Sequence, residues 1–254
     1  MTVTSRKNEK VRLFRELSRE KKQRDSLGLF AAEGDHLCGE LVAEGYTIQL
    51  ALCTERAAQR YPETVKKLSE QAQEYLVINE ELAEYISDTK APQGLFAVAE
   101  KPAMELREDA CKAVVLDGVQ DPGNVGTVIR TAEALGIDAV VLLGGCADVW
   151  SPKTLRSSMG SALRLPCVNG DVGTLSALKE SGFALFGAML DDTAKRLGKF
   201  GFPEKSAVVI GSEGGGITRD VADILDNRVY IPISGAESLN AAVAAAIILW
   251  ELAK

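Results

Sequence analysis

Three polar stretches in the second half of the chain carry residue types that could do chemistry. The segment DPGNVGTVIRTAEALG supplies Asn124 and Arg130, and VVIGSEGGGIT places Glu213 directly before three glycines. The segment IPISGAESLNAAVAAAIILWE supplies Ser238 and Asn240 at the start of an apolar helix. Glycines let backbone N–H and C=O groups approach a ligand closely. The three stretches therefore predict a site that combines a carboxylate, bare backbone and small polar side chains.

Each of these side chains also has a structural interpretation. Asn124 stands where an N-cap belongs, and Ser238 or Asn240 can cap the final helix. Glu213 can stabilise the N-terminus of the next helix through the helix dipole. Arg130 can form a surface salt bridge, but its apolar sequence neighbours favour a functional role. For Asn124 the capping and functional interpretations stay equally weighted.

The elements that must position these residues alternate between strands and helices. Apolar runs rich in Val, Ile and Leu are typical of strands in a parallel sheet that is covered on both faces. Ligands of such sheets bind beyond the carboxyl ends of the strands, where the three polar stretches fall. The predicted strands lie within 113–119, 139–145, 184–190, 206–212 and 228–234, and the predicted helices within 124–136, 173–181, 216–226 and 240–252.

The first half of the chain forms a separate α/β unit in this interpretation. Strand-like runs at 29–34, 48–54, 74–79 and 94–100 alternate with helical stretches at 35–45, 62–71 and 80–87. A charged stretch that carries Pro102 follows and is typical of a linker. The predicted domains are therefore 1–105 and 106–254.

Composition limits the function classes. The chain has 254 residues, of which 46% are hydrophobic and 26% charged, as in a soluble globular protein. No apolar run approaches the roughly 20 residues that cross a bilayer, and the charged N-terminus is unlike a signal peptide. These features predict a cytoplasmic protein without a membrane partner.

Cysteine and histidine usage gives no sign of a metal site or a disulfide framework. The cysteines are odd in number and scattered, which favours reduced thiols packed as small hydrophobic groups. The single histidine, His36, fits a structural or surface role better than catalysis. The cysteines are Cys38, Cys53, Cys111, Cys146 and Cys167.

The charge is unevenly distributed along the chain. The net charge is −7, yet residues 1–25 hold nine basic and four acidic side chains and carry +5. The remainder, with 20 basic and 32 acidic residues, carries −12. A basic element of this kind indicates binding to a phosphate backbone. From charge alone, a solvated basic helix is an equal alternative.

The last predicted helix, from Ala241 to Trp250, is apolar almost all round. A helix without a polar face must be buried in a core or in an oligomer interface. Its alanines permit close approach of backbones. We therefore expect a homodimer built partly on this helix.

Taken in this order, the three polar stretches resemble the SpoU/TrmH branch of the SPOUT RNA 2′-O-ribose methyltransferases. The resemblance covers about residues 112–254, and the first half is similar to the family's L30e-like RNA substrate-binding domain. It implies a deep trefoil knot in the C-terminal α/β domain, although folds are otherwise almost always unknotted. It also implies a pocket for S-adenosylmethionine and a catalytic set. The cofactor residues implied are Met189, Gly211, Gly214, Ile231 and Leu239, and the catalytic residues are Arg130, Asn124, Glu213, Ser238 and Asn240.

The resemblance implies that Arg130 acts as the base, whereas our preferred hypothesis is that it binds a neighbouring phosphate and the ribose 2′-oxygen. Proton removal by this arginine is a second, weaker interpretation, because a guanidinium is effectively always protonated. A loop with Arg156, Ser157 and Ser158 either faces RNA, as in the family, or forms a capped, solvated turn. Ribosomal RNA is the preferred substrate over tRNA. A non-catalytic RNA-binding or ribosome assembly factor is a further alternative. An ordinary Rossmann enzyme would need a G-x-G-x-x-G after its first strand, which is missing.

Overall fold

The computed structural model describes every residue except Met1, Ala236 and Glu237. The chain forms two compact units, and the first consists of Met1–Ala103 together with Trp150–Arg164. The second consists of Met104–Val149 and Leu165–Lys254. The sequence places one boundary near residue 106, and the structure changes unit close to that point. It changes again on both sides of Trp150–Arg164, because that segment packs on the first unit.

The sheet of the first unit is mixed. Its strands lie in the order β1-β4-β3-β5-β2, with β1, β4 and β3 parallel and β5 antiparallel to both β3 and β2. Burial is nearly continuous along β2, β3 and β5, because both faces of this sheet are covered. The strands are β1 (Thr2–Val3), β2 (Leu29–Glu33), β3 (Ile48–Thr54), β4 (Glu74–Ile78) and β5 (Leu95–Glu100).

Helices cover both faces of this sheet. On one face, Val11, Phe14 and Leu17 of the first helix pack with Leu82 and Ile86 of a later one in a single buried cluster. The N-terminal basic segment is thus anchored by an apolar stripe. The helices are α1 (Glu9–Arg19), α2 (Lys21–Leu27), α3 (Asp35–Ala43), α4 (Glu55–Arg60), α5 (Pro62–Gln71) and α6 (Glu80–Ile86).

The segment Trp150–Arg164 adds α8 (Pro152–Ser157) and a short 3-10 helix, Ser161–Leu163, to the first unit. Here α8 lies against β2. The Trp150 ring lies 4.6 Å from that of Phe30, centroid to centroid. The Tyr46 hydroxyl donates to the Leu163 carbonyl over 2.9 Å.

The sheet of the second unit is parallel at every pairing, as the sequence predicts. Its strand order is β10-β12-β9-β11-β6-β7-β8. Parallel sheets are covered on both faces, so their strands are apolar along their whole length. The strands of this half show that continuous apolar pattern. The strands are β6 (Lys112–Asp117), β7 (Ala139–Leu142), β8 (Cys167–Asn169), β9 (Ala184–Ala188), β10 (Lys195–Arg196), β11 (Ser206–Gly211) and β12 (Asn227–Tyr230).

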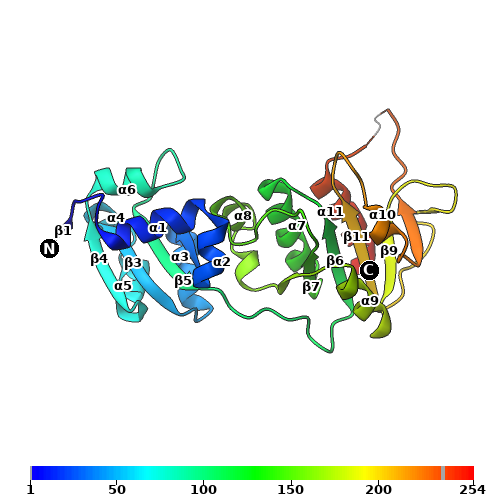
Figure 1. Cartoon of the computed structure of the whole chain (residues 1–254), viewed down its shortest axis with the longest axis horizontal. Coiled ribbons are helices and arrows are strands. Elements are labelled where there is room, and N and C mark those ends of the chain that lie inside the picture. The colour runs from blue at the N-terminus through cyan, green and yellow to red at the C-terminus, as the bar shows by residue number, and fades with distance from the viewer. Residues whose placement is uncertain (1, 236–237) are drawn as a thin grey trace. The chain divides into compact units, whose positions relative to one another are not determined.

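Two layers of helices enclose this sheet (Figure 1). On one face α9 (Val172–Glu180) and α10 (Arg219–Ala222) join a buried cluster with alternate residues of β6, β7, β9 and β11. On the other, α11 (Ala241–Ala253) packs on α7 (Pro122–Ala134), β6 and β11. The fold class is therefore α/β in both units, with the parallel sheet in the C-terminal one. The trefoil knot stays a prediction.

Two local expectations differ from the structure. The helix predicted at 216–226 is reduced to Arg219–Ala222, because the glycines before it form a closed loop instead of a helical turn. The strand predicted at 228–234 ends at Tyr230. The final helix is buried where it packs on α7, β6 and β11, whereas Val243, Ile247 and Trp250 are exposed in the single chain, so burial of that face in an oligomer interface stays a prediction.

Candidate functional site

Three of the predicted catalytic side chains form one hydrogen-bonded chain in the second unit. The Asn240 side-chain nitrogen donates to Asn124 Oδ1 over 3.1 Å. The Asn124 side-chain nitrogen in turn donates to a carboxylate oxygen of Glu213 in a short hydrogen bond. These residues come from the start of α11, the first turn of α7 and the glycine-rich loop after β11. The fold thus brings together the three polar stretches that the sequence singles out.

The start of α7 corrects one interpretation of Asn124. The N-cap of this helix is Asp121, whose carboxylate accepts from the Asn124 backbone N–H over 2.9 Å, and Pro122 takes the first helical position. Asn124 therefore does not cap the helix. Its side-chain amide is left to bond Glu213 and Asn240.

Asn240, in contrast, both caps its helix and joins the site. Its Oδ1 accepts from the backbone N–H groups of Ala242 at 3.0 Å and Val243 at 3.2 Å. The helix amides thereby fix the amide of Asn240 with its nitrogen toward Asn124. That orientation makes Asn124 an acceptor on one side and a donor toward Glu213 on the other. The N-terminus of α11 thus sets the polarity of the whole chain.

The glycine-rich loop is closed on itself by main-chain bonds. Ser212 and Gly216 exchange N–H···O bonds of 3.1 and 2.9 Å. A Cβ added to Gly211 would lie 2.2 Å from the Gly216 carbonyl carbon and 2.4 Å from the Ile217 nitrogen. Only glycine fits at position 211, whereas a Cβ at Gly214 would meet open space.

Asp117 holds the far side of this loop and is a residue that the sequence analysis missed. It is the buried last residue of β6 and is the register partner of Gly211. Its carboxylate accepts from the backbone N–H and the hydroxyl of Thr218, over 2.6 and 2.9 Å. The available signal was an acid that directly follows a run of buried apolar residues, at the end of a strand.

A cavity of about 330 Å³ opens at the carboxyl ends of β9 and β12. Its lining includes three of the five predicted cofactor residues, Met189, Ile231 and Leu239. Further apolar lining comes from Leu190 and Ile248, among others. Its volume and apolar lining are typical of small-molecule sites. Leu239 directly precedes Asn240, so cavity and polar chain share one segment.

Four predicted site residues lie outside both the cavity lining and the hydrogen-bonded chain. They are Gly211, Gly214, Arg130 and Ser238. The two glycines belong to the closed loop and are not among the lining residues of that cavity. Arg130 and Ser238 are exposed, and neither makes a hydrogen bond or ion pair with the part of the chain that the structure describes. Arg130 lies on the same helix as Asn124. Because its side chain is exposed and has no partner in the described residues, its guanidinium is available to a ligand.

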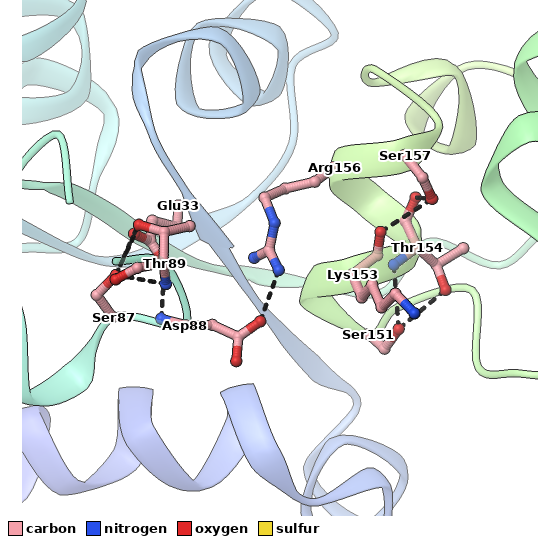
Figure 2. Close-up of polar contacts among 9 residues, drawn as sticks. All are labelled: Glu33, Ser87, Asp88, Thr89, Ser151, Lys153, Thr154, Arg156 and Ser157. Atoms are coloured by element: carbon pink, nitrogen blue, oxygen red, sulfur yellow. Dashed lines mark hydrogen bonds and ion pairs between the residues drawn. The ribbon is translucent and has the colours of Figure 1, made fainter. Parts of the chain in front are cut away.

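The loop with Arg156, Ser157 and Ser158 belongs to the first unit. Figure 2 shows Arg156 directed toward Asp88, with its Nη2 2.6 Å from Asp88 Oδ2. Ser158 is buried and donates its hydroxyl to the Leu155 carbonyl. Ser157 likewise bonds carbonyls of its own helix. The structure therefore favours a structural turn over a phosphate contact for the two serines.

The turn that presents Asp88 is itself organised by Glu33 (Figure 2). The hydroxyls of Ser87 and Thr89 donate to Glu33 Oε1 over 2.5 and 2.9 Å, and the Asp88 N–H donates to Oε2 over 3.1 Å. In the same unit, the exposed His36 ring lies 3.1 Å from the Met159 carbonyl oxygen, which fits a structural surface role.

The thiols fit the packing role that the sequence suggests. All five cysteines are free, and Cys38, Cys53 and Cys167 are buried. Burial raises the pKa of the Cys38 thiol and raises that of Cys167 to about 12. Within the described residues, no group of three His, Cys, Asp or Glu side chains could hold a metal ion. In the same part of the chain, no helix is long and apolar enough to cross a bilayer.

A parallel α/β sheet with a cavity and a polar chain at its strand ends defines a cofactor-binding enzyme fold. The chain belongs to the SpoU rRNA methylase family, whose pattern matches residues 112–250. Residues 8–97 match an MRM3-like substrate binding domain.

Two sequence relatives and one solved structure illustrate the similarity. The 23S rRNA (guanosine(2553)-2′-O)-methyltransferase RlmP of Bacillus subtilis is 35% identical over 98% of both chains. The 23S rRNA (uridine(2479)-2′-O)-methyltransferase of Streptomyces viridochromogenes is 36% identical over 67% of this chain and 63% of its own. The AdoMet-bound rRNA methyltransferase of Sinorhizobium meliloti superposes with a TM-score of 0.88 at 28% identity, over 99% of this chain and 97% of that one.

Proposed function

We propose that the protein is an S-adenosylmethionine-dependent RNA 2′-O-ribose methyltransferase that acts on ribosomal RNA. The observation that carries this proposal is the junction of the Asn240–Asn124–Glu213 chain with the apolar cavity at the strand ends. The names of the two rRNA methyltransferase relatives and the AdoMet-bound structural neighbour support it.

The cavity lined by Met189, Ile231 and Leu239 is the proposed cofactor site. Its apolar side chains suit an adenine ring, and main-chain groups at the ends of β9 and β12 can fix its orientation. Gly211 and Gly214 contribute through the closed loop, which bare backbone at position 211 makes possible. When bound, S-adenosylmethionine supplies a methyl group already activated by its sulfonium charge, so the chemistry needs no metal.

The remaining work for the protein is placing the ribose hydroxyl and stabilising its oxygen as it loses its proton. Arg130 is the proposed group for that oxygen and a neighbouring phosphate, because it is exposed and free of protein partners in the described residues. A guanidinium matches a phosphate with two parallel N–H bonds. Asn124 and Asn240, with Ser238, orient the ribose, and Glu213 fixes the amide of Asn124.

The relatives support a class of substrate, but they do not fix the target nucleotide. The two curated relatives methylate a guanosine and a uridine, so the shared family does not fix the base. Both act on 23S rRNA, which favours rRNA over tRNA here. In this proposal 1–105 is the L30e-like RNA-binding domain and 106–254 the knotted methyltransferase domain of a cytoplasmic enzyme.

A homodimer through α11 completes the proposal. Val243, Ile247 and Trp250 are exposed by 48%, 38% and 58%, and their spacing places them on one face of the helix. Large apolar side chains gathered on one helix face are typical of an interface.

The decisive experiment maps 2′-O-methyl groups in rRNA and tRNA from cells with and without the gene. We expect one rRNA position to lose its methyl group, and purified protein with S-adenosylmethionine to restore it on the unmodified RNA. Unchanged maps, together with no uptake of S-adenosylmethionine in calorimetry, would refute the proposal. RNA binding without methyl transfer would instead favour the assembly-factor alternative.

A further inference from the structure

The first unit contains a second cavity, of about 420 Å³, whose lining is mainly basic instead of apolar. Its lining comes from the segment before α1, from α1 itself and from α6. Four of the six lining residues are basic, and one is acidic. The lining residues are Arg6, Lys7, Arg12, Arg15, Glu16 and Tyr85. We call this cavity the basic cleft.

An aromatic ring organises the guanidinium groups of the basic cleft. The Cζ atoms of Arg6 and Arg15 lie 4.7 and 4.4 Å from the centroid of the Tyr85 ring. Tyr85 is half-buried and packs against the core beneath α1 and α6, so the ring is a fixed support. A cation–π contact holds a guanidinium without using its N–H donors. The donors therefore stay available to an acceptor.

The charges of the basic cleft are only partly neutralised. Arg6 pairs with Glu81 over 2.7 Å and Arg12 with Glu16 over 3.6 Å. In the described residues, Lys7 and Arg15 have no ion-pair partner. The Arg15 Nε is moreover buried without a hydrogen-bond partner, which is rare in folded proteins. The lack of ion-pair partners for Lys7 and Arg15 points to an anion as the missing partner.

From this arrangement we infer that the basic cleft binds the phosphodiester backbone of the RNA substrate. Guanidinium groups bind phosphate oxygens bidentately, which favours an anionic ligand over a neutral one. Because the chain outside residues 1–25 carries −12, a polyanion is repelled elsewhere and steered to this element. Contacts to phosphate oxygens carry no sequence information, so binding at the basic cleft is expected to be independent of base sequence.

This inference rests on the proposed function for the identity of the polyanion, and it assigns that function a second contact point outside the catalytic residues. The sequence predicted only a general attraction of RNA to residues 1–25. The inference assigns RNA binding to the residues that line the basic cleft. In that set Lys7 and Arg15 contribute most, because they lack protein partners, and Tyr85 is a positioning residue.

The test measures binding of the full-length protein to a 23S rRNA transcript at a series of salt concentrations. The variants are Arg15→Gln and, because loss of the Tyr85 contact could disturb folding, the exposed Lys7→Gln. Arg60→Gln is the matched control: Arg60 also lies over a tyrosine ring, that of Tyr61 at 5.3 Å, but outside the basic cleft. Circular dichroism melting checks that each variant folds.

We expect each cleft variant to weaken RNA binding about tenfold and to reduce the slope of log K against log salt by about 0.7 to 0.9, the value for one lost phosphate contact. Arg60→Gln should change neither quantity. Equal slopes for wild type, both cleft variants and the control would overturn the inference. Saturable binding of inorganic phosphate that Arg15→Gln abolishes, with an unchanged RNA slope, would overturn it too and assign the cleft to a free anion.

The same samples separate this inference from the proposed function. Calorimetric binding of S-adenosylmethionine should be equal in all variants, because the cofactor cavity lies in the other unit. If the variants transfer methyl groups and the slope of log K against log salt is unchanged, RNA binding at the basic cleft is refuted and the proposed enzyme activity stands. If the cleft variants change the slope but the wild type transfers no methyl group, RNA binding at the basic cleft stands and the proposed enzyme activity is refuted.

Discussion

Replacing Gly211 by alanine tests whether the closed glycine loop shapes the cofactor site. The added Cβ would stand 2.2 Å from the carbonyl carbon and 2.4 Å from the carbonyl oxygen of Gly216. These atoms are main chain, so a rotamer change cannot relieve the overlap and the Ser212–Gly216 bridge must open. Overpacking of this kind costs about 1–3 kcal/mol. For a chain of this size that corresponds to a fall in Tm of roughly 2–12 °C.

Gly214→Ala is the matched control, because it lies in the same loop. It has open space around its Cβ position and no positive φ. Differential scanning calorimetry should show a lower Tm for Gly211→Ala only, and isothermal titration should show weaker S-adenosylmethionine binding for the same variant. Equal melting temperatures and equal affinities in the two variants would refute the role assigned to close backbone approach.

Three further outcomes are expected. Arg130→Lys keeps the charge but loses the two-pronged donor, so kcat should fall about 10²-fold with unchanged cofactor affinity; near-wild-type turnover would contradict the phosphate and alkoxide role. Trp250→Glu, at an exposed apolar position of α11, should convert a dimer to a monomer in sedimentation equilibrium with an unchanged far-UV circular dichroism spectrum; a variant that stays dimeric would exclude this face. At pH 8, Ellman's reagent should label Cys111 in the native protein, whereas Cys38 and Cys167 should react only after denaturation. Burial raises the pKa of both thiols, so their reactive thiolate is scarce at that pH; rapid native labelling of all three would contradict this.

The fold was predictable where hydrophobic pattern decides it. The runs that form β6, β9 and β11 are continuous and apolar because both of their faces are covered, and a one-dimensional pattern records that burial. Short elements such as β8, Cys167–Asn169, leave no such record. The helix after the glycine loop was overestimated, because a main-chain bridge between Ser212 and Gly216 is invisible in side-chain periodicity.

Long-range pairing set the limit of prediction in the first unit. Trp150–Arg164 follows β7 in the chain, and nothing local in it indicates that it packs on another unit. The contacts that place it there join residues more than 100 positions apart, as in Tyr46 with Leu163 and Phe30 with Trp150. The cap of α7 shows the same limit on a small scale, since Asp121 and Asn124 both suit the position and only the structure selects Asp121.

The sequence predicted that Asn124, Glu213 and Asn240 would meet, but not the direction of their hydrogen bonds. Asn240 has two duties, and these can be separated by substitution. Asp caps helices as well as Asn does, so Asn240→Asp should keep the bonds to the Ala242 and Val243 amides and leave Tm unchanged. It loses the nitrogen that donates to Asn124 and places a carboxylate oxygen against Asn124 Oδ1.

Asn124 then cannot satisfy both neighbours. If its amide turns to donate to the new carboxylate, its oxygen faces the Glu213 carboxylate, and one acceptor is left without a donor in either orientation. We therefore expect Asn240→Asp to lower methyl transfer at least tenfold at wild-type stability, an effect of about 1.4 kcal/mol on the barrier. Asn240→Ala should lose activity and also about 1 kcal/mol of stability through the missing cap. Full activity in Asn240→Asp would mean that Asn240 serves the helix alone and that the polarity set by α11 has no part in the reaction.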